Sequence, residues 1–244
     1  VITVFPDCFT SLGGNQYINS AATGNWEDFL IGEMLPAVEE RYRVRPGRDH
    51  RAVFGKSSGG FGAISHGMLH GDVWGAIACH SGDMGFAMCY ARDFPVVLDA
   101  LAPFGRDIGR LLEHYAAKPK IDGAEFHNLE IMAMAAFYDP DPTRPMGVRL
   151  PVDLFTGELI EERWANWLSH DPVEMADRSD CLDSLRSLRG LYIDCGDRDQ
   201  FALVYGARAL SRKLQEAGIE HRFEEFDDNH TAVDYRQDVS LPFL

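Results

Sequence analysis

A G-x-S-x-G pattern occupies residues 55–59, between a predicted strand and a predicted helix, and it limits the folds open to this chain. The apolar run 51–54 before it has the composition of a short strand, and the glycine-rich run 60–69 after it predicts a helix. A strand that turns at once into a helix forces the central serine into a strained backbone conformation. Flanking glycines let strand and helix approach without Cβ clashes. The pattern therefore predicts a nucleophile elbow with Ser57 at its tip.

The predicted helix also brings backbone N–H groups close to the serine hydroxyl. The N–H groups of a first helical turn favour nearby negative charge. The backbone N–H of Ser58 is therefore a candidate donor to an oxyanion. Chance occurrence of the pattern in a glycine-rich turn is the alternative, and the flanking strand and helix argue against it.

Composition sets the class of protein. Of the 244 residues, 45% are hydrophobic, which is enough for a substantial core. No apolar run approaches the ~20 residues that span a bilayer, so we expect a soluble chain with no membrane partner. The net charge of −15 argues against nucleic acid or an anionic membrane surface as a partner.

The five cysteines are odd in number and irregularly spaced, and neither a C-x-x-C pair nor a zinc-like His/Cys spacing occurs. This pattern predicts free thiols in the core and no metal site. A reducing, cytoplasmic compartment is the expectation that follows. No signal peptide is visible, but the sequence opens at Val1 inside a predicted strand, so a segment upstream is compatible with it.

Strands and helices alternate along the chain. Residues 1–5 form a continuous apolar, β-branched run of the kind found in strands buried on both faces of a parallel sheet. A β-α-β-α-β order implies a mainly parallel sheet with right-handed crossovers, flanked by helices. The expected strands are 1–5, 51–54, 75–82, 191–196 and 219–226, and the expected helices are 26–42 with a kink at Pro36, 60–69, and 201–217 closed by Gly218.

The alternation breaks between residues 83 and 179. Four helical stretches occur there, separated by proline-rich links. An insertion of this length is no connector, since such loops usually run ~2–6 residues. We predict one domain over residues 1–244, with a core of 1–82 and 180–244 and a helical cap at about 83–179. The expected cap helices are 95–102, 108–117, 129–138 and 161–168.

A loop rich in Ser, Gly and Asn covers residues 8–25. Loops at the carboxyl ends of strands carry function in open α/β sheets. Its residues Leu12, Gly13, Gly14 and Tyr17 are therefore candidates for the wall of an active site. A connector of this composition without function is the alternative.

A serine hydroxyl needs an imidazole to take its proton, and the imidazole needs an acid to fix its tautomer. In a strand-elbow-helix fold these partners follow in the order serine, acid, histidine, from loops after later strands. His230 lies just past the last predicted strand, in a polar loop, and is the candidate base. His80 and His170 are the alternatives.

The acid is less sharply defined by the residues alone. Asp194 lies inside the strand 191–196, while Asp197 and Asp199 lie in the loop that follows it. Spacing favours Asp199 over Asp197 only slightly. Asp83, after the strand 75–82, is a fourth candidate that lies apart from the others.

These motifs resemble the esterase D-like family of the α/β-hydrolase superfamily, whose relatives include S-formylglutathione hydrolase, enterochelin and feruloyl esterases, and the mycolyltransferases. The likeness covers nearly the whole chain and is more specific for the family than for a substrate. The resemblance implies Ser57 as nucleophile, Asp199 as acid and His230 as base. The matching segments are P-D at 6–7, Y-I-N-S at 17–20, G-N-W-E-D-F at 24–29, Y-R at 42–43, G-K-S-S-G-G-F-G-A at 55–63, H-S-G at 80–82, G-x-x-D-x-F at 196–201 and D-N-H at 228–230.

The chain departs from the family pattern in two ways. Family members carry an earlier strand and an H-G loop that donates a second oxyanion N–H, and Val1 starts after the place of both. Two alternatives follow: the chain is a fragment, or residues 12–14 substitute for the loop. Loss of one oxyanion donor typically lowers kcat by ~10²–10³-fold. A sheet without those strands exposes an edge, which favours a homodimer. The cap is also longer than simple members of the family need.

The resemblance thus implies a serine carboxylesterase that cleaves carboxylic or thioesters through an acyl-enzyme, with a small-molecule ester as substrate and neither metal nor organic cofactor. Two alternatives stay open. One is acyl transfer to an alcohol by the same residues. The other is a non-catalytic α/β-hydrolase-like scaffold that binds a ligand.

Overall fold

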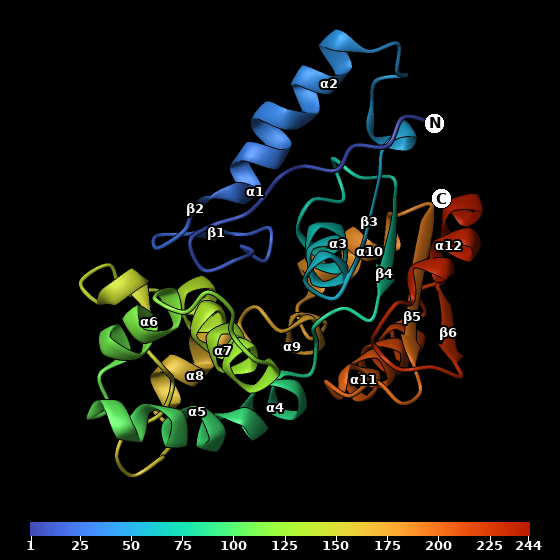
Figure 1. Ribbon diagram of the computed structural model, residues 1–244. Helices are drawn as coiled ribbons and strands as arrows, with labels where there is room; N and C mark the ends of the chain where they lie inside the picture. The colour runs from blue at the N-terminus through green and yellow to red at the C-terminus, as the bar shows by residue number, and fades with distance from the viewer. The chain divides into compact units, whose positions relative to one another are not determined.

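Four parallel strands form the sheet that carries the predicted elbow (Figure 1). The computed structural model describes residues 1–244. The order along the sheet is β3-β4-β5-β6, so each strand pairs with its neighbour in sequence. The strands are β3 (Ala52–Lys56), β4 (Ala76–His80), β5 (Gly190–Gly196) and β6 (Arg222–Phe226).

The two central strands are the most buried part of the chain. Every residue of β4 is buried, as is all of β5 after its first residue. The edge strands β3 and β6 are partly exposed along most of their length. A parallel strand covered on both faces reads as an unbroken apolar run, which is why the sequence predicts β4 and β5 well.

Helices cover the sheet. The helix that follows the elbow, α3 (Ser58–Leu69), packs on β3 and β4, and α10 (Ser179–Arg186) packs on α3. The predicted C-terminal helix is α11 (Leu203–Glu216), which packs on β5 and is followed by Gly218 in the left-handed conformation, at φ 65°. Further helices of the chain are α4 (Phe86–Cys89), α9 (Pro172–Met175) and α12 (Gln237–Phe243), and short 3-10 turns are η2 (Arg48–His50) and η6 (Asp234–Arg236).

The chain forms two compact units. The sheet belongs to the unit made of residues 30–89 and 170–244, together with Ile2. The other unit comprises Val1, residues 3–29 and residues 90–169. The division into a core of 1–82 and 180–244 and a cap at about 83–179 stays a prediction.

The second unit is mainly helical, as predicted for most of residues 83–179. Its longest helix, α7, begins with a capping box in which Asp122 and Glu125 bond each other's backbone N–H groups. Aromatic side chains of this unit pack together, among them Tyr138 and Trp167 with ring centroids 5.5 Å apart. Its elements are β1 (Asn19–Ser20), β2 (Gly24–Asn25), α1 (Trp26–Phe29), η3 (Ala91–Asp93), α5 (Phe94–Leu101), η4 (Ala102–Phe104), α6 (Ile108–Ala116), α7 (Gly123–Tyr138), η5 (Pro145–Gly147) and α8 (Glu161–Leu168).

One predicted strand is wrong. Residues 1–5 form no strand, and the side chains of Val1 and Phe5 are largely exposed. Strand propensity needs a partner strand and a packed face to take effect. No strand pairs with residues 1–5, so their apolar run stays irregular.

The predicted helix 26–42 is continuous in sequence but changes type near Pro36. After α1 it continues as a π-helical turn, η1 (Leu30–Met34), and then as α2 (Leu35–Arg41). Proline has no N–H to bond the carbonyl four residues earlier. Prolines and π-helical turns are both sites at which helices bend.

None of the helices combines the length and the apolar character that crossing a bilayer requires.

Close backbone contact joins α3 to the end of β4. A Cβ atom on Gly60 would lie 2.7 Å from the carbonyl oxygen of His80 and 2.8 Å from the Cα of Gly82. Both neighbours are backbone atoms, which cannot rotate away. Only glycine therefore fits at position 60 without moving a strand or a helix.

We expect Gly60→Ala to lower the free energy of unfolding by ~1–3 kcal/mol, the usual effect of overpacking a tight site. Urea unfolding followed by circular dichroism measures the change. Gly32→Ala is the matched control, because a Cβ there meets nothing within 4 Å. Alanine favours a helix over glycine by up to ~1 kcal/mol, so the control should be neutral or stabilising. Equal stability of the two variants would contradict the packing argument.

Candidate active site

The G-x-S-x-G segment has the backbone geometry of a strained turn. Ser57 adopts φ 57° and ψ −124°, a region that non-glycine residues rarely occupy. A Cβ on Gly55 would lie 2.4 Å from the carbonyl carbon and oxygen of Gly59. Glycine at 55 is thus a steric requirement of the turn. The partly exposed Ser57 stands between the end of β3 and the start of α3.

Backbone hydrogen bonds fix the turn and orient its amides. The N–H of Ser57 donates to the carbonyl of His80 over 2.9 Å, which ties the elbow to β4. The carbonyl of Ser57 accepts the N–H of Phe61 over 2.9 Å and so begins the helical hydrogen bonds of α3. Ser58 is the first residue of this helix, and first-turn N–H groups have no acceptor within their own helix. Its N–H is therefore suited to bind an anionic oxygen.

An acid and an imidazole meet after the last two strands. Nδ1 of His230 lies 2.7 Å from Oδ2 of Asp199. The His230 side chain is 10% exposed and that of Asp199 is fully buried. In neutral histidine, a proton on Nδ1 that is donated to Asp199 leaves Nε2 as an acceptor. This tautomer is the one a general base requires.

The carboxylate of Asp199 is held by two further donors. Its Oδ1 accepts the N–H of Phe201 over 2.9 Å, and its Oδ2 accepts the thiol of Cys195 over 3.7 Å. Burial, and then the charge of Asp199, raise the pKa of Cys195, so this cysteine stays a protonated donor. A buried carboxylate needs such partners to offset the loss of water. Asp199 is therefore fixed in one orientation.

The loop that carries the acid also holds the base. The backbone N–H of His230 donates to Oε1 of Gln200 over 3.0 Å. The ring of Phe201 packs edge-on against the His230 ring, with centroids 4.8 Å apart. A Cβ on Gly196 would lie 2.5 Å from the carbonyl oxygen of Asp228, so the two loops approach closely there. The loop after β5, which carries Asp199, therefore also holds His230 in place.

Of the acids considered from sequence, Asp199 is the one that contacts His230. Asp197 is exposed, and Asp83 is buried. Asp194 binds His80 instead. The alternative base His170 precedes Asp171, whose buried carboxylate accepts backbone N–H groups at the starts of α4 and α9.

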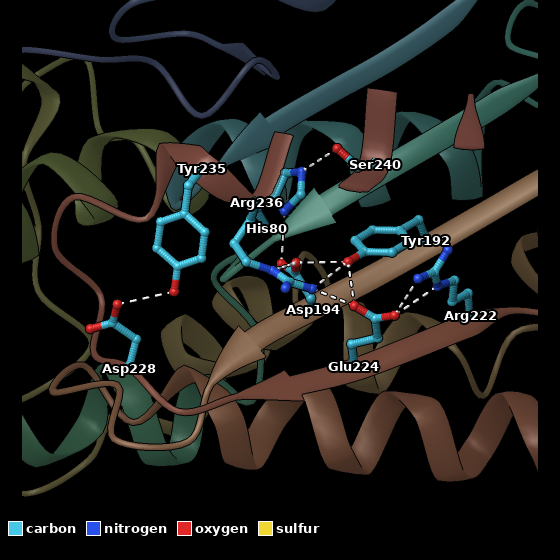
Figure 2. Close-up of polar contacts among 9 residues, drawn as sticks. All are labelled: His80, Tyr192, Asp194, Arg222, Glu224, Asp228, Tyr235, Arg236 and Ser240. Atoms are coloured by element: carbon cyan, nitrogen blue, oxygen red, sulfur yellow. Dashed lines mark hydrogen bonds and ion pairs between the residues drawn. The ribbon is translucent and has the colours of Figure 1, made fainter. Parts of the chain in front are cut away.

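A second Asp–His pair joins the neighbouring strands β4 and β5 (Figure 2). Nδ1 of His80 lies 2.7 Å from Oδ1 of Asp194, and its Nε2 lies 2.8 Å from Oγ of Ser240. Ser240 is fully buried, so no substrate reaches its hydroxyl. The sequence names His80 and Asp194 as candidates but not Ser240, which lies in the C-terminal helix α12 with no motif around it.

The candidates in the loop 8–25 belong to the other unit. Gly13 lies in a tight turn at φ 97°, where its N–H and carbonyl bond the carbonyl and N–H of Thr10. Leu12 is buried, and Tyr17 has the unusual φ of 59°. The contribution of Leu12, Gly13, Gly14 and Tyr17 to an oxyanion hole or a substrate site stays a prediction.

No group of three or more His, Cys, Asp or Glu side chains is arranged to hold a metal ion.

Comparison with known proteins identifies relatives by sequence. A family model described as "Putative esterase" matches residues 15–240. Esterase MT1326 of Mycobacterium tuberculosis (strain CDC 1551 / Oshkosh) is 33% identical over 111 residues. That match covers 41% of this chain and 23% of the relative.

Solved structures of esterases share the fold. A ferulic acid esterase superimposes with a TM-score of 0.55 at 20% identity, covering 95% of this chain and 66% of the other. An S-formylglutathione hydrolase from Staphylococcus aureus gives a TM-score of 0.52 at 15% identity, covering 94% and 66%. The chain spans just under two thirds of the length of these proteins. The α/β-hydrolase fold predicted from sequence, a mainly parallel sheet flanked by helices, is confirmed.

The Asp199–His230 contact can be measured directly. We expect a downfield imidazole N–H resonance in the proton NMR spectrum, since a proton shared with a buried carboxylate is deshielded and exchanges slowly. Asp199→Asn should shift or remove this resonance, because the neutral amide is a weaker acceptor. Asp197→Asn should leave it in place. A resonance unaffected by Asp199→Asn would assign it to another histidine.

Proposed function

The chain belongs to the esterase family whose model it matches over residues 15–240, and from this we propose that it is a serine carboxylesterase acting on a small-molecule ester. The observation that carries the proposal is the buried 2.7 Å contact between His230 and Asp199, in the same unit as the strained Ser57 turn. Ser57, Asp199 and His230 each follow the carboxyl end of a parallel strand. In open α/β sheets this edge is where ligands bind.

In the proposed first step, Oγ of Ser57 attacks the acyl carbon while Nε2 of His230 takes the hydroxyl proton. Asp199 stabilises the imidazolium that forms and keeps its ring in place. The imidazolium then protonates the leaving alkoxide or thiolate, and an acyl-enzyme on Ser57 remains. In the second step, water gives a proton to His230 and attacks the acyl carbon, which releases the acid and restores the serine.

The oxyanion of each tetrahedral intermediate needs preorganised donors. The N–H of Ser58 is the first of them in our proposal, at the start of the 12-residue helix α3. For the second we propose the loop that holds Leu12, Gly13 and Gly14, with Tyr17 beside the substrate. Acyl transfer follows the same course when an alcohol replaces water in the second step. The helical insertion at about 83–179 would then act as a cap that limits water, as proposed from its length.

Two further expectations accompany the proposal. All five cysteines are free and buried, which is compatible with a reducing, cytoplasmic location. Strand β3 is an edge of the sheet, and an uncovered edge favours pairing with a second copy. Gel filtration combined with light scattering tests the homodimer.

Ser57→Ala should abolish hydrolysis of p-nitrophenyl acetate and butyrate, with kcat/KM falling on the order of 10⁴–10⁶-fold. Labelling by a fluorophosphonate should vanish in the same variant, because the probe reacts with an activated serine hydroxyl. Ser240→Ala, which removes the serine of the buried second group, should keep labelling. Hydrolysis that survives Ser57→Ala would mean a different nucleophile. An unmutated chain without turnover or labelling would favour the ligand-binding scaffold.

Asp199→Asn should lower kcat about 10⁴-fold, because an amide no longer holds His230 in the tautomer that accepts a proton. Asp197→Asn, two residues earlier and exposed, is the control and should stay within about twofold of the unmutated chain. Steady-state kinetics with p-nitrophenyl butyrate measures kcat of both variants. A large effect of Asp197→Asn alone would mean that Asp197, and not Asp199, is the acid.

A further inference from the structure

A row of polar side chains crosses strands β4, β5 and β6 on the sheet (Figure 2). His80, Asp194 and Glu224 are direct partners in the strand register. Asp194 and Glu224 thus place two carboxylates side by side on adjacent strands. Like charges in this position destabilise a sheet unless a cation lies between them.

Arg236 of η6 supplies that cation. Its Nε donates to Oδ2 of Asp194 over 2.8 Å, and its terminal nitrogen donates to Oε2 of Glu224 and to the hydroxyl of Tyr192, the latter over 2.7 Å. The Arg236 side chain is only 12% exposed. Burial alone would lower the pKa of Arg236, but the bonds to Asp194 and Glu224 outweigh burial and raise it. The guanidinium is therefore a permanent charge inside this row.

Backbone groups of two residues in this row bind the turn at Ser57 and the end of β4. The carbonyl of His80 accepts the N–H of Ser57 over 2.9 Å, and the carbonyl of Asp194 accepts the N–H of Ser81 over 2.8 Å. The His80 ring is locked between Asp194 and Ser240. A shift of Asp194 would therefore move His80, and with it the acceptor that fixes Ser57.

The residue next to Arg236 holds the loop of the base. The hydroxyl of Tyr235 donates to Oδ2 of Asp228 over 3.0 Å, two residues before His230. The backbone N–H of Asn229, and then the Tyr235 hydroxyl, lower the pKa of Asp228, so it stays an anionic acceptor. The Arg236 guanidinium lies 4.6 Å from the centre of the Phe226 ring, at the end of the strand that leads into this loop.

We propose that two positioning residues, Arg236 and Tyr235, set the position of the proposed nucleophile relative to the proposed base. Arg236 acts on Ser57 through Asp194 and His80, and Tyr235 acts on His230 through Asp228. This inference rests on the proposed function, in which Ser57 and His230 react together. Neither Arg236 nor Tyr235 contacts the reacting atoms in this scheme.

The expected signature is a loss in kcat with little change in KM. A misplacement of about 1 Å between reacting groups costs on the order of 10²-fold in rate. Substrate binding depends on other surfaces and should change less. A purely structural role would lower the melting temperature without changing kcat of the folded fraction.

The test compares Arg236→Lys and Tyr235→Phe with Arg222→Gln. Lysine keeps the charge but loses the planar fork that spans Asp194 and Glu224. Phenylalanine removes only the bond to Asp228, so this variant should fold. Arg222 is the matched control, because it binds Glu224 but not Asp194. We expect kcat to fall ~10–100-fold in Arg236→Lys and several-fold in Tyr235→Phe, and to stay within twofold in Arg222→Gln.

Folded Arg236→Lys and Tyr235→Phe variants with unchanged kcat would overturn the inference. An equal loss of kcat in Arg222→Gln would overturn it as well. Any weakening of the polar row would then lower kcat, whether or not Asp194 is involved. The His230 imidazole N–H resonance gives a readout that needs no turnover. If the unmutated chain hydrolyses no ester, the proposed function fails, while a resonance that moves in Tyr235→Phe but not in Arg222→Gln still supports positional control of His230. An unmoved resonance in both variants would overturn it.

Discussion

The close approach of backbone to backbone around Ser57 is the constraint on which the carboxyl edge of the sheet depends. Gly55 lets β3 turn directly into α3, and Gly60 lets α3 lie against the end of β4. A side chain at either position would separate these elements. The turn keeps Ser57 in a conformation that costs ~1–3 kcal/mol, and the surrounding packing has to offset that cost. The bond from the Ser57 N–H to the carbonyl of His80 is one of the contacts that do so.

The edge formed after β5 and β6 is organised by side chains rather than by backbone contact alone. Asp199 is removed from water and receives hydrogen bonds from an imidazole, a thiol and an amide. Each of these donors comes from a different place in the chain, which makes the carboxylate a junction between β5 and the loop after β6. The hydrogen bonds of such a network strengthen one another, so the loss of one donor to Asp199 also weakens the contacts made by the other donors.

Patterns with strong local causes could be predicted from the sequence. The elbow, the buried strands β4 and β5 and the helix α11 all follow from glycine placement or apolar periodicity, and each is present. The strand expected at residues 1–5 is absent, because strand formation depends on a partner that local composition does not reveal. Spacing alone favours Asp199 over Asp197 only slightly. The two residues lie in the same loop, and the sequence does not show which of their side chains is buried. Arg236 lies in no motif, and its contacts depend on β5 and β6 meeting in space.

The pairing of His80 with Asp194 and Ser240 has a consequence for how such sites are recognised. Its distances of 2.7 and 2.8 Å fall in the range expected of a serine, a base and an acid that act together. A template search over atomic coordinates alone would therefore select a group that no solvent or substrate can enter. The two serines differ in their surroundings: Ser57 is partly exposed and has a strained backbone, whereas Ser240 is fully buried. In folds of this kind, solvent access is a stricter criterion for a reactive serine than the geometry of its hydrogen bonds.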